Sequence, residues 1–94
     1  MPKDARDVRS ALLKKGFIND RSPGDRHFVL IVGGVKTSIW TKISHGEKEI
    51  DDNLLGYMAS RQMKITKRQF VDFIDCDMDG AAYVVELRQK GHIA

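Results

Sequence analysis

A pair of glycines, Gly33-Gly34, places the strongest constraint on how this 94-residue chain can fold. Residues 28–32 before the pair and residues 35–43 after it are rich in β-branched side chains, which favour strands. Both central residues of a type I′ turn need a positive φ, and glycine adopts that conformation at little steric cost. We therefore predict an antiparallel β-hairpin with the two glycines at its tip.

A two-residue loop also predicts the register of this hairpin, because side chains alternate between the faces of a sheet. The pairs expected on one face are Val32–Val35, Leu30–Thr37 and Phe28–Ile39. The pairs expected on the other face are Ile31–Lys36, Val29–Ser38, His27–Trp40 and Asp25–Lys42. We expect the first face to form the core, whereas the second is half polar and cationic and carries His27 beside Trp40.

The rest of the chain predicts helices around this hairpin and one further strand. Asp4 can cap a helix that Gly16 ends, and a short strand follows from Phe17. Further helices are expected from residue 51 or 52 to about residue 62, from Thr66, and from residues 79–80 to Gly91. We predict an α+β fold with a three-stranded antiparallel sheet. Residues 1–65 would form its core, and residues 66–94 would be a helical extension packed on the same domain.

Composition limits the cellular setting and the class of partner. The single cysteine, Cys76, excludes an internal disulfide and favours a reducing compartment, so we expect a cytoplasmic protein. The longest apolar run is far too short to cross a bilayer, and the charged N-terminus does not resemble a secretory signal. The net charge is +3, and cations cluster on the first helix, a pattern that permits binding of RNA or DNA.

Residues 75–86 match the sequence pattern of a calcium-binding EF-hand loop. Its carboxylates would be Asp75, Asp77, Asp79 and Glu86, with Gly80 at the sharp turn. A plainer interpretation is that Asp75 and Asp77 are solvated turn residues and that Asp79 caps the last helix. Both interpretations are open at this point, and the calcium hypothesis predicts an interaction domain that responds to the metal.

His27 and Trp40 each allow a structural and a functional interpretation. A histidine at a strand start is often satisfied by a backbone carbonyl, but it can also transfer protons near neutral pH. A tryptophan on a small sheet often covers core, but it can also stack on an unpaired base. The spacing of the histidines is not that of a helical metal pair, so no metal or other cofactor is expected.

Four segments, taken in order, resemble the HicA-type toxins. They are DVRSALLKKGF from Asp7, GDRH from Gly24, TSIWTK from Thr37 and SHGEKEI from Ser44. The resemblance spans roughly residues 5–65 and implies an mRNA interferase with a double-stranded-RNA-binding-domain-like α-β-β-β-α fold, neutralised by a HicB-like antitoxin. Two departures are Asp25, where the family often has serine, and the chain from Thr66 onward, which exceeds the family core.

By this resemblance the active-site histidine falls on His27, as a general acid or base. Asp25 would orient its ring or favour its charged form, and His45 would help to stabilise developing charge. The residues expected to bind RNA are Lys36, Trp40, Lys42, Lys14 and Lys15. The alternative is a non-catalytic RNA-binding module of the same fold, in which His27 and Trp40 only stack and form hydrogen bonds.

Overall fold

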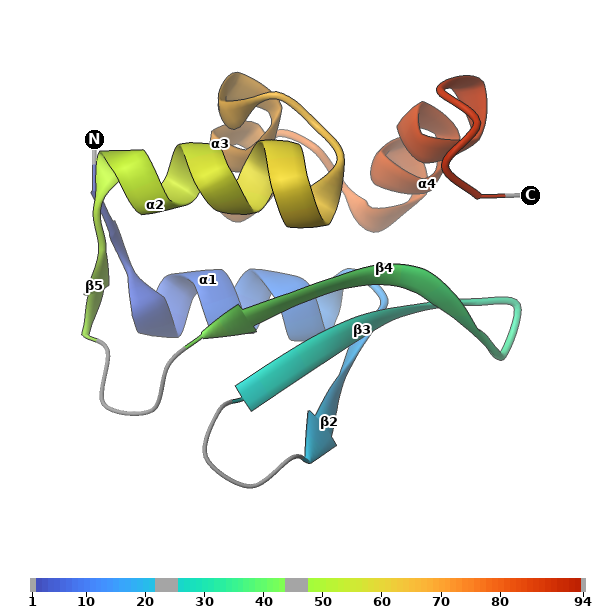
Figure 1. Ribbon diagram of the computed structural model, residues 1–94, viewed down its shortest axis with the longest axis horizontal. Coiled ribbons are helices and arrows are strands. Elements are labelled where there is room, and N and C mark those ends of the chain that lie inside the picture. The colour runs from blue at the N-terminus through green and yellow to red at the C-terminus, as the bar shows by residue number, and fades with distance from the viewer. Residues whose placement is uncertain (1, 22–25, 44–47, 94) are drawn as a thin grey trace.

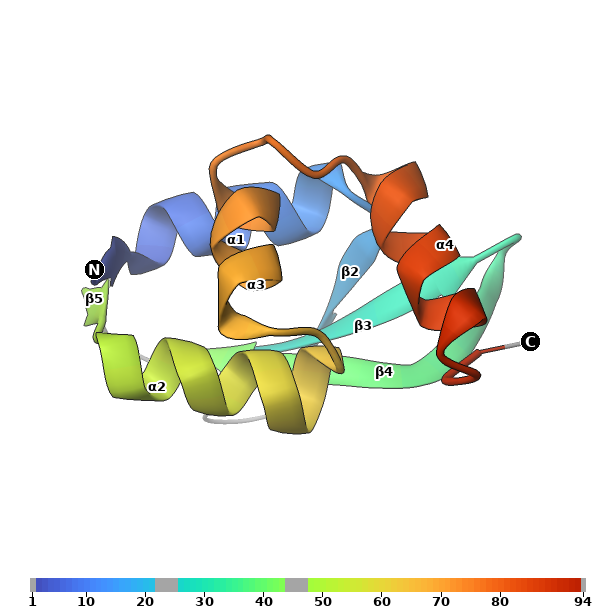
Figure 2. The same ribbon diagram turned by 90° about the horizontal axis from the view of Figure 1, so that it is seen from above.

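The computed structural model describes residues 2–21, 26–43 and 48–93, which form an α+β fold (Figure 1). Its elements are β1 (Lys3–Asp4), α1 (Ala5–Lys14), β2 (Phe17–Arg21), β3 (Arg26–Val32), β4 (Val35–Ile43), β5 (Glu49–Ile50), α2 (Asp52–Tyr57), the π-helix η1 (Met58–Met63), α3 (Lys67–Ile74) and α4 (Gly80–Gln89). Strands β2-β3-β4 form the predicted three-stranded antiparallel sheet, and the helices lie over one of its faces (Figure 2). No helix in the described ranges has the length and apolar character needed to span a membrane.

The helix boundaries follow the capping signals in the sequence. The Asp4 carboxylate accepts a hydrogen bond from the Arg6 amide at 2.8 Å and starts α1, and Gly16 follows its end with a φ of +103°. Thr66 and Gln69 form the predicted capping box at the start of α3. The Asp79 carboxylate caps α4. These ends are local features, so the sequence predicted them correctly.

The hairpin has Gly33 and Gly34 at its tip, both with positive φ, but its register differs from the prediction. Val32–Val35 and Ile31–Lys36 pair as expected. Beyond them β4 is displaced by two residues, so the predicted pairs His27–Trp40, Phe28–Ile39 and Val29–Ser38 are wrong. The observed pairs are His27–Lys42, Phe28–Thr41 and Val29–Trp40. The predicted pair Asp25–Lys42 is also wrong, because Lys42 pairs with His27. Asp25 itself lies outside the described residues.

A side chain explains this displacement. The Thr37 hydroxyl donates to the Leu30 carbonyl at 2.9 Å and accepts from the Ile39 amide at 3.2 Å. The hydroxyl thus replaces ladder hydrogen bonds and lets β4 accommodate two additional residues as an irregularity between Val29 and Ile31. Because side chains alternate with a period of two, a shift of two residues leaves the side chains beyond the irregularity on their predicted faces. Phe28, Leu30 and Ile39 are therefore still buried.

Helices α3 and α4 contribute to the same hydrophobic core as the sheet. The rings of Phe17 on β2 and Tyr83 on α4 stack with centroids 5.9 Å apart, and Phe73 of α3 contacts both rings edge-on. The Tyr83 hydroxyl donates to the Met63 carbonyl at 2.7 Å. The segment from Thr66 onward therefore packs directly on β2 and η1.

Strands β1 and β5 were not predicted, because two-residue strands carry no periodic signal. They pair Lys3 with Ile50 and Asp4 with Glu49, and the Ala5 amide donates to the Lys48 carbonyl at 3.0 Å. This short ladder brings the start of α1 beside the chain that enters α2 (Figure 1).

Candidate functional site

The face of the sheet away from the helices, here called the open face, carries the residues singled out in the sequence. Its members on β2, β3 and β4 are Ile18, His27, Val29, Ile31, Lys36, Trp40 and Lys42. Within the described ranges, no helix lies over this face (Figures 1 and 2). Ile18, Val29 and Trp40 form one cross-strand row, and the side chains of Ile18 and Trp40 are each 42% exposed. The exposure of Trp40 favours a contact surface over a core role.

His27 lies on the open face, as the alternation of side chains predicted. Its ring centroid is 5.6 Å from that of Trp40, with the ring planes tilted by 43°. Its Nδ1 atom is buried and has no hydrogen-bond partner among the described residues. Nδ1 is therefore not open to contact with a ligand. The β2 register partner of His27 is Asp20, an acidic residue that the sequence reasoning did not connect with it.

The predicted RNA-binding lysines divide into two groups. Lys36 and Lys42 are exposed on β4, where they pair with Ile31 and His27, and Lys14 is exposed in the last turn of α1. Lys15 is different, because its ammonium donates to the backbone carbonyls of Phe73 and, at 2.8 Å, Met78.

Lys15 therefore has a structural role. Its ammonium also lies 4.8 Å from the centroid of the Phe73 ring, and the side chain is partly buried. These contacts join the end of α1 to the segment between α3 and α4. We accordingly leave Lys15 out of the RNA-binding surface proposed below. The two groups predicted to assist His27, Asp25 and His45, lie outside the described residues.

Three of the four carboxylates of the EF-hand pattern, those of Asp75, Asp79 and Glu86, have separate protein partners. Asp75 forms an ion pair with Lys3 at 2.7 Å, and Asp79 accepts from the Ala82 amide at 2.7 Å. Hydrogen bonds from the Gln69 amide and the Lys90 ammonium, at 2.9 and 3.0 Å, lower the pKa of Glu86. Helix α4 already begins at the sixth position of the pattern. Across the described ranges, no three His, Cys, Asp or Glu side chains are grouped as metal ligands. The calcium hypothesis therefore has no preformed site to support it.

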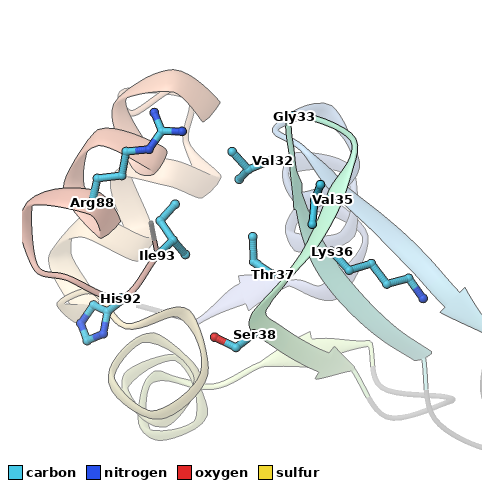
Figure 3. A pocket seen from close by; sticks show the side chains of 9 residues that line it. All are labelled: Val32, Gly33, Val35, Lys36, Thr37, Ser38, Arg88, His92 and Ile93. Atoms are coloured by element: carbon cyan, nitrogen blue, oxygen red, sulfur yellow. The ribbon is translucent and has the colours of Figure 1, made fainter.

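A cleft of about 520 Å³ lies between the hairpin tip and the end of α4 (Figure 3). Val32 and Ile93 face each other across it. Its lining residues are Val32, Gly33, Val35, Lys36, Thr37, Ser38, Arg88, His92 and Ile93. His27 is not among them, so this cleft and the histidine of the open face are separate features.

Comparison of the chain with protein-family models, curated proteins and solved structures finds no match. The resemblance to HicA-type toxins is accordingly carried by the four sequence segments alone. The function proposed below therefore rests on the positions of His27, Trp40 and Lys42 on the open face.

Proposed function

We propose that this protein is an endoribonuclease that cleaves mRNA without a metal ion, similar to the HicA-type toxins, on a double-stranded-RNA-binding-domain-like fold. One observation carries the proposal. An imidazole, an exposed indole and a lysine are adjacent on the open face, with His27 5.6 Å from Trp40 and in register with Lys42. A proton-transfer group, a stacking surface and a cation are the parts that cleavage of single-stranded RNA requires.

The chemistry assigned to His27 is one proton transfer during internal attack. The RNA 2′-hydroxyl loses its proton, its oxygen bonds to phosphorus, and the bond from phosphorus to the 5′-oxygen breaks as that oxygen gains a proton. Nε2 of His27 would accept the first proton or donate the second, because Nδ1 is buried. Nearby lysine ammonium groups would stabilise the charge that develops on the phosphate oxygens.

The same face fits a second candidate, a non-catalytic RNA-binding module. The observation that favours it is the lack of a hydrogen-bond partner for His27 Nδ1 in the described part of the chain. General bases in known sites are commonly oriented by such a partner. Under this candidate, His27 and Trp40 would hold RNA without cleaving it.

The proposed protein partner is a HicB-like antitoxin. An acidic partner that covers the open face would bury Ile18 and Trp40 and would oppose Lys36 and Lys42. Binding of such a partner would block access of RNA to His27.

The test compares cleavage of a transcribed mRNA by wild-type protein, His27→Ala and a matched control, His92→Ala. His92 is an exposed histidine near the end of the chain. We expect His27→Ala to slow cleavage roughly 10²–10⁴-fold, the usual contribution of a general acid or base. Its effect on the free energy of unfolding should stay below about 1 kcal/mol, as for most surface substitutions. His92→Ala should cleave like wild type, and only these two active proteins should arrest growth when expressed.

The two candidates differ in their outcomes. Equal cleavage by wild type and His27→Ala would refute the role of His27. RNA binding by both proteins, with cleavage by neither, would leave the non-catalytic module as the function.

A further inference from the structure

A second cationic feature lies at the start of α1, away from the helix end that carries Lys14. It is a hollow of about 340 Å³, lined by Asp4, Ala5, Arg6, Arg9 and Lys48. Arg6 and Arg9 are three residues apart on α1, so their side chains lie on the same helix face. Lys48 comes from a remote part of the chain, and the hydrogen bond from the Ala5 amide to its carbonyl holds it in place.

The charges around this hollow favour an anion. In the part of the chain that the structure describes, Arg6, Arg9 and Lys48 form no ion pair, whereas Lys3 on the neighbouring strand is paired with Asp75. One carboxylate, that of Asp4, also lines the hollow, and one of its oxygens accepts from the Arg6 amide at 2.8 Å.

Among the described residues, no other acidic side chain lines the hollow. Asp7 lines a different depression, beside Lys14, and Glu49 is not a lining residue. Within the described lining, three cationic side chains therefore accompany one carboxylate, and the positive end of the α1 dipole adds to their field. Phosphate is an anion that arginine side chains bind with two parallel hydrogen bonds and that lysine side chains bind as a point charge.

This hollow lies close to the end of the sheet that carries His27. Lys42 is the register partner of His27, and Ile43, the next residue, ends β4. Lys48 is five residues further on, so its Cα lies within about 18 Å of that of Ile43. Both ribbon views place the end of β4, β5 and the start of α1 on the same side of the molecule (Figures 1 and 2).

We infer that the hollow formed by Arg6, Arg9 and Lys48 binds a backbone phosphate of the RNA strand that the open face presents to His27. This inference rests on the proposed RNA-binding function and adds a second anchoring point to it. The anchor would set the direction in which the strand leaves the site. It would act on binding and would take no part in the proton transfers.

The test measures the salt dependence of binding with a fluorescein-labelled single-stranded 2′-O-methyl oligonucleotide. This probe lacks the attacking hydroxyl, so binding is read without cleavage. Each phosphate contact on a single strand contributes about 0.7 to the slope of log K against log salt. Because the hollow holds one phosphate, we expect Arg6→Gln/Arg9→Gln to reduce the magnitude of that slope by about 0.7. Lys48→Gln, which alters no helix, should reduce it in the same direction by no more than that amount.

The matched control is Arg61→Gln/Arg68→Gln, which removes the same charge from exposed positions on η1 and α3. It should keep the wild-type slope. With cleavable RNA, the Arg6/Arg9 variant should raise KM and leave kcat unchanged, whereas His27→Ala should lower kcat.

Three outcomes would overturn the inference. The first is a wild-type slope in both the Arg6/Arg9 and the Lys48 variants, and the second is an equal reduction in the control. The third uses poly-glutamate as a probe for acidic protein. If the Arg6/Arg9 and Lys48 variants lose binding to poly-glutamate but keep the wild-type oligonucleotide slope, the hollow is a site for acidic protein. In all three, wild-type binding of the oligonucleotide would remain, whereas failure of the proposed function itself would appear as no oligonucleotide binding by wild type.

Discussion

The rings of His27 and Trp40 lie 5.6 Å apart although the two residues are not register partners. Trp40 pairs with Val29, and His27 pairs with Lys42, so the ring contact is diagonal across β3 and β4. A diagonal contact of this kind is within reach of aromatic side chains. It leaves the indole partly exposed while it shields one side of the imidazole.

Trp40 is the only tryptophan, and its contribution to RNA binding can be measured against Ile18. Both side chains are 42% exposed and lie in one cross-strand row, but only Trp40 has an aromatic face. We expect Trp40→Ala to weaken binding of single-stranded RNA by roughly 1–3 kcal/mol, as for loss of one base-stacking ring. Ile18→Ala should weaken RNA binding clearly less than Trp40→Ala does. Fluorescence anisotropy would measure both affinities. Equal losses would argue for a general apolar contact in place of stacking.

Thr41 and Gln62 form a partly buried polar link between β4 and η1. The Thr41 side chain is fully buried, and its hydroxyl donates to Gln62 Oε1 at 2.5 Å. We expect Thr41→Val and Gln62→Met each to lower the free energy of unfolding by about 1–2 kcal/mol. Each substitution removes one partner of the hydrogen bond and leaves the other polar group unpaired. The double variant should lose less unfolding free energy than the sum of the losses in the two single variants. Urea unfolding would measure all three. Additive losses would mean that the two groups do not interact.

Gly80 and Gly56 provide opposite tests of helix packing. A Cβ at Gly80 would lie 3.0 Å from the Lys15 carbonyl oxygen, a backbone atom, so Gly80→Ala should destabilise the fold by about 1–3 kcal/mol. A Cβ at Gly56 would meet only the flexible Lys67 side chain at 3.6 Å. There, Gly56→Ala should stabilise the fold by up to about 1 kcal/mol through helix propensity. Thermal unfolding would measure both, and a stabilising Gly80→Ala would contradict the close packing of α4 on α1.

Tyr83 predicts a loss of stability at high pH. Burial raises the pKa of its hydroxyl far above the usual value of about 10. The folded state therefore retains a proton that the unfolded state releases above about pH 10. The stabilisation is complete below that pH and decreases above it by up to about 1.4 kcal/mol per pH unit.

Tyr83→Phe isolates this effect from other titrations. The difference in unfolding free energy between wild type and variant should be constant below about pH 10 and should fall as pH rises beyond it. Denaturant unfolding at a series of pH values would measure the difference. A difference that stays constant to higher pH would show that the hydroxyl is not buried in the folded state.

Much of the local structure was determined by the sequence alone. The positive φ of Gly33 and Gly34, the capping carboxylate of Asp4 and the capping box at Thr66 act within a few residues, so local patterns predict them. The face of the sheet that carries His27 was also predictable, because the alternation of side chains is unchanged by a shift of two residues.

Tertiary structure decided which side chains meet. The irregularity at Thr37 replaced Trp40 by Lys42 as the register partner of His27, and no local pattern signals such a side-chain bond to the ladder. In the sequence, Lys15 and Lys48 are both lysines beside other charged residues, and nothing local distinguishes their roles. The structure ties Lys15 to Phe73, 58 residues away, and brings Lys48 beside α1. A contact between remote segments depends on how whole elements pack, and the free energy of that packing is not encoded in any short stretch of the chain.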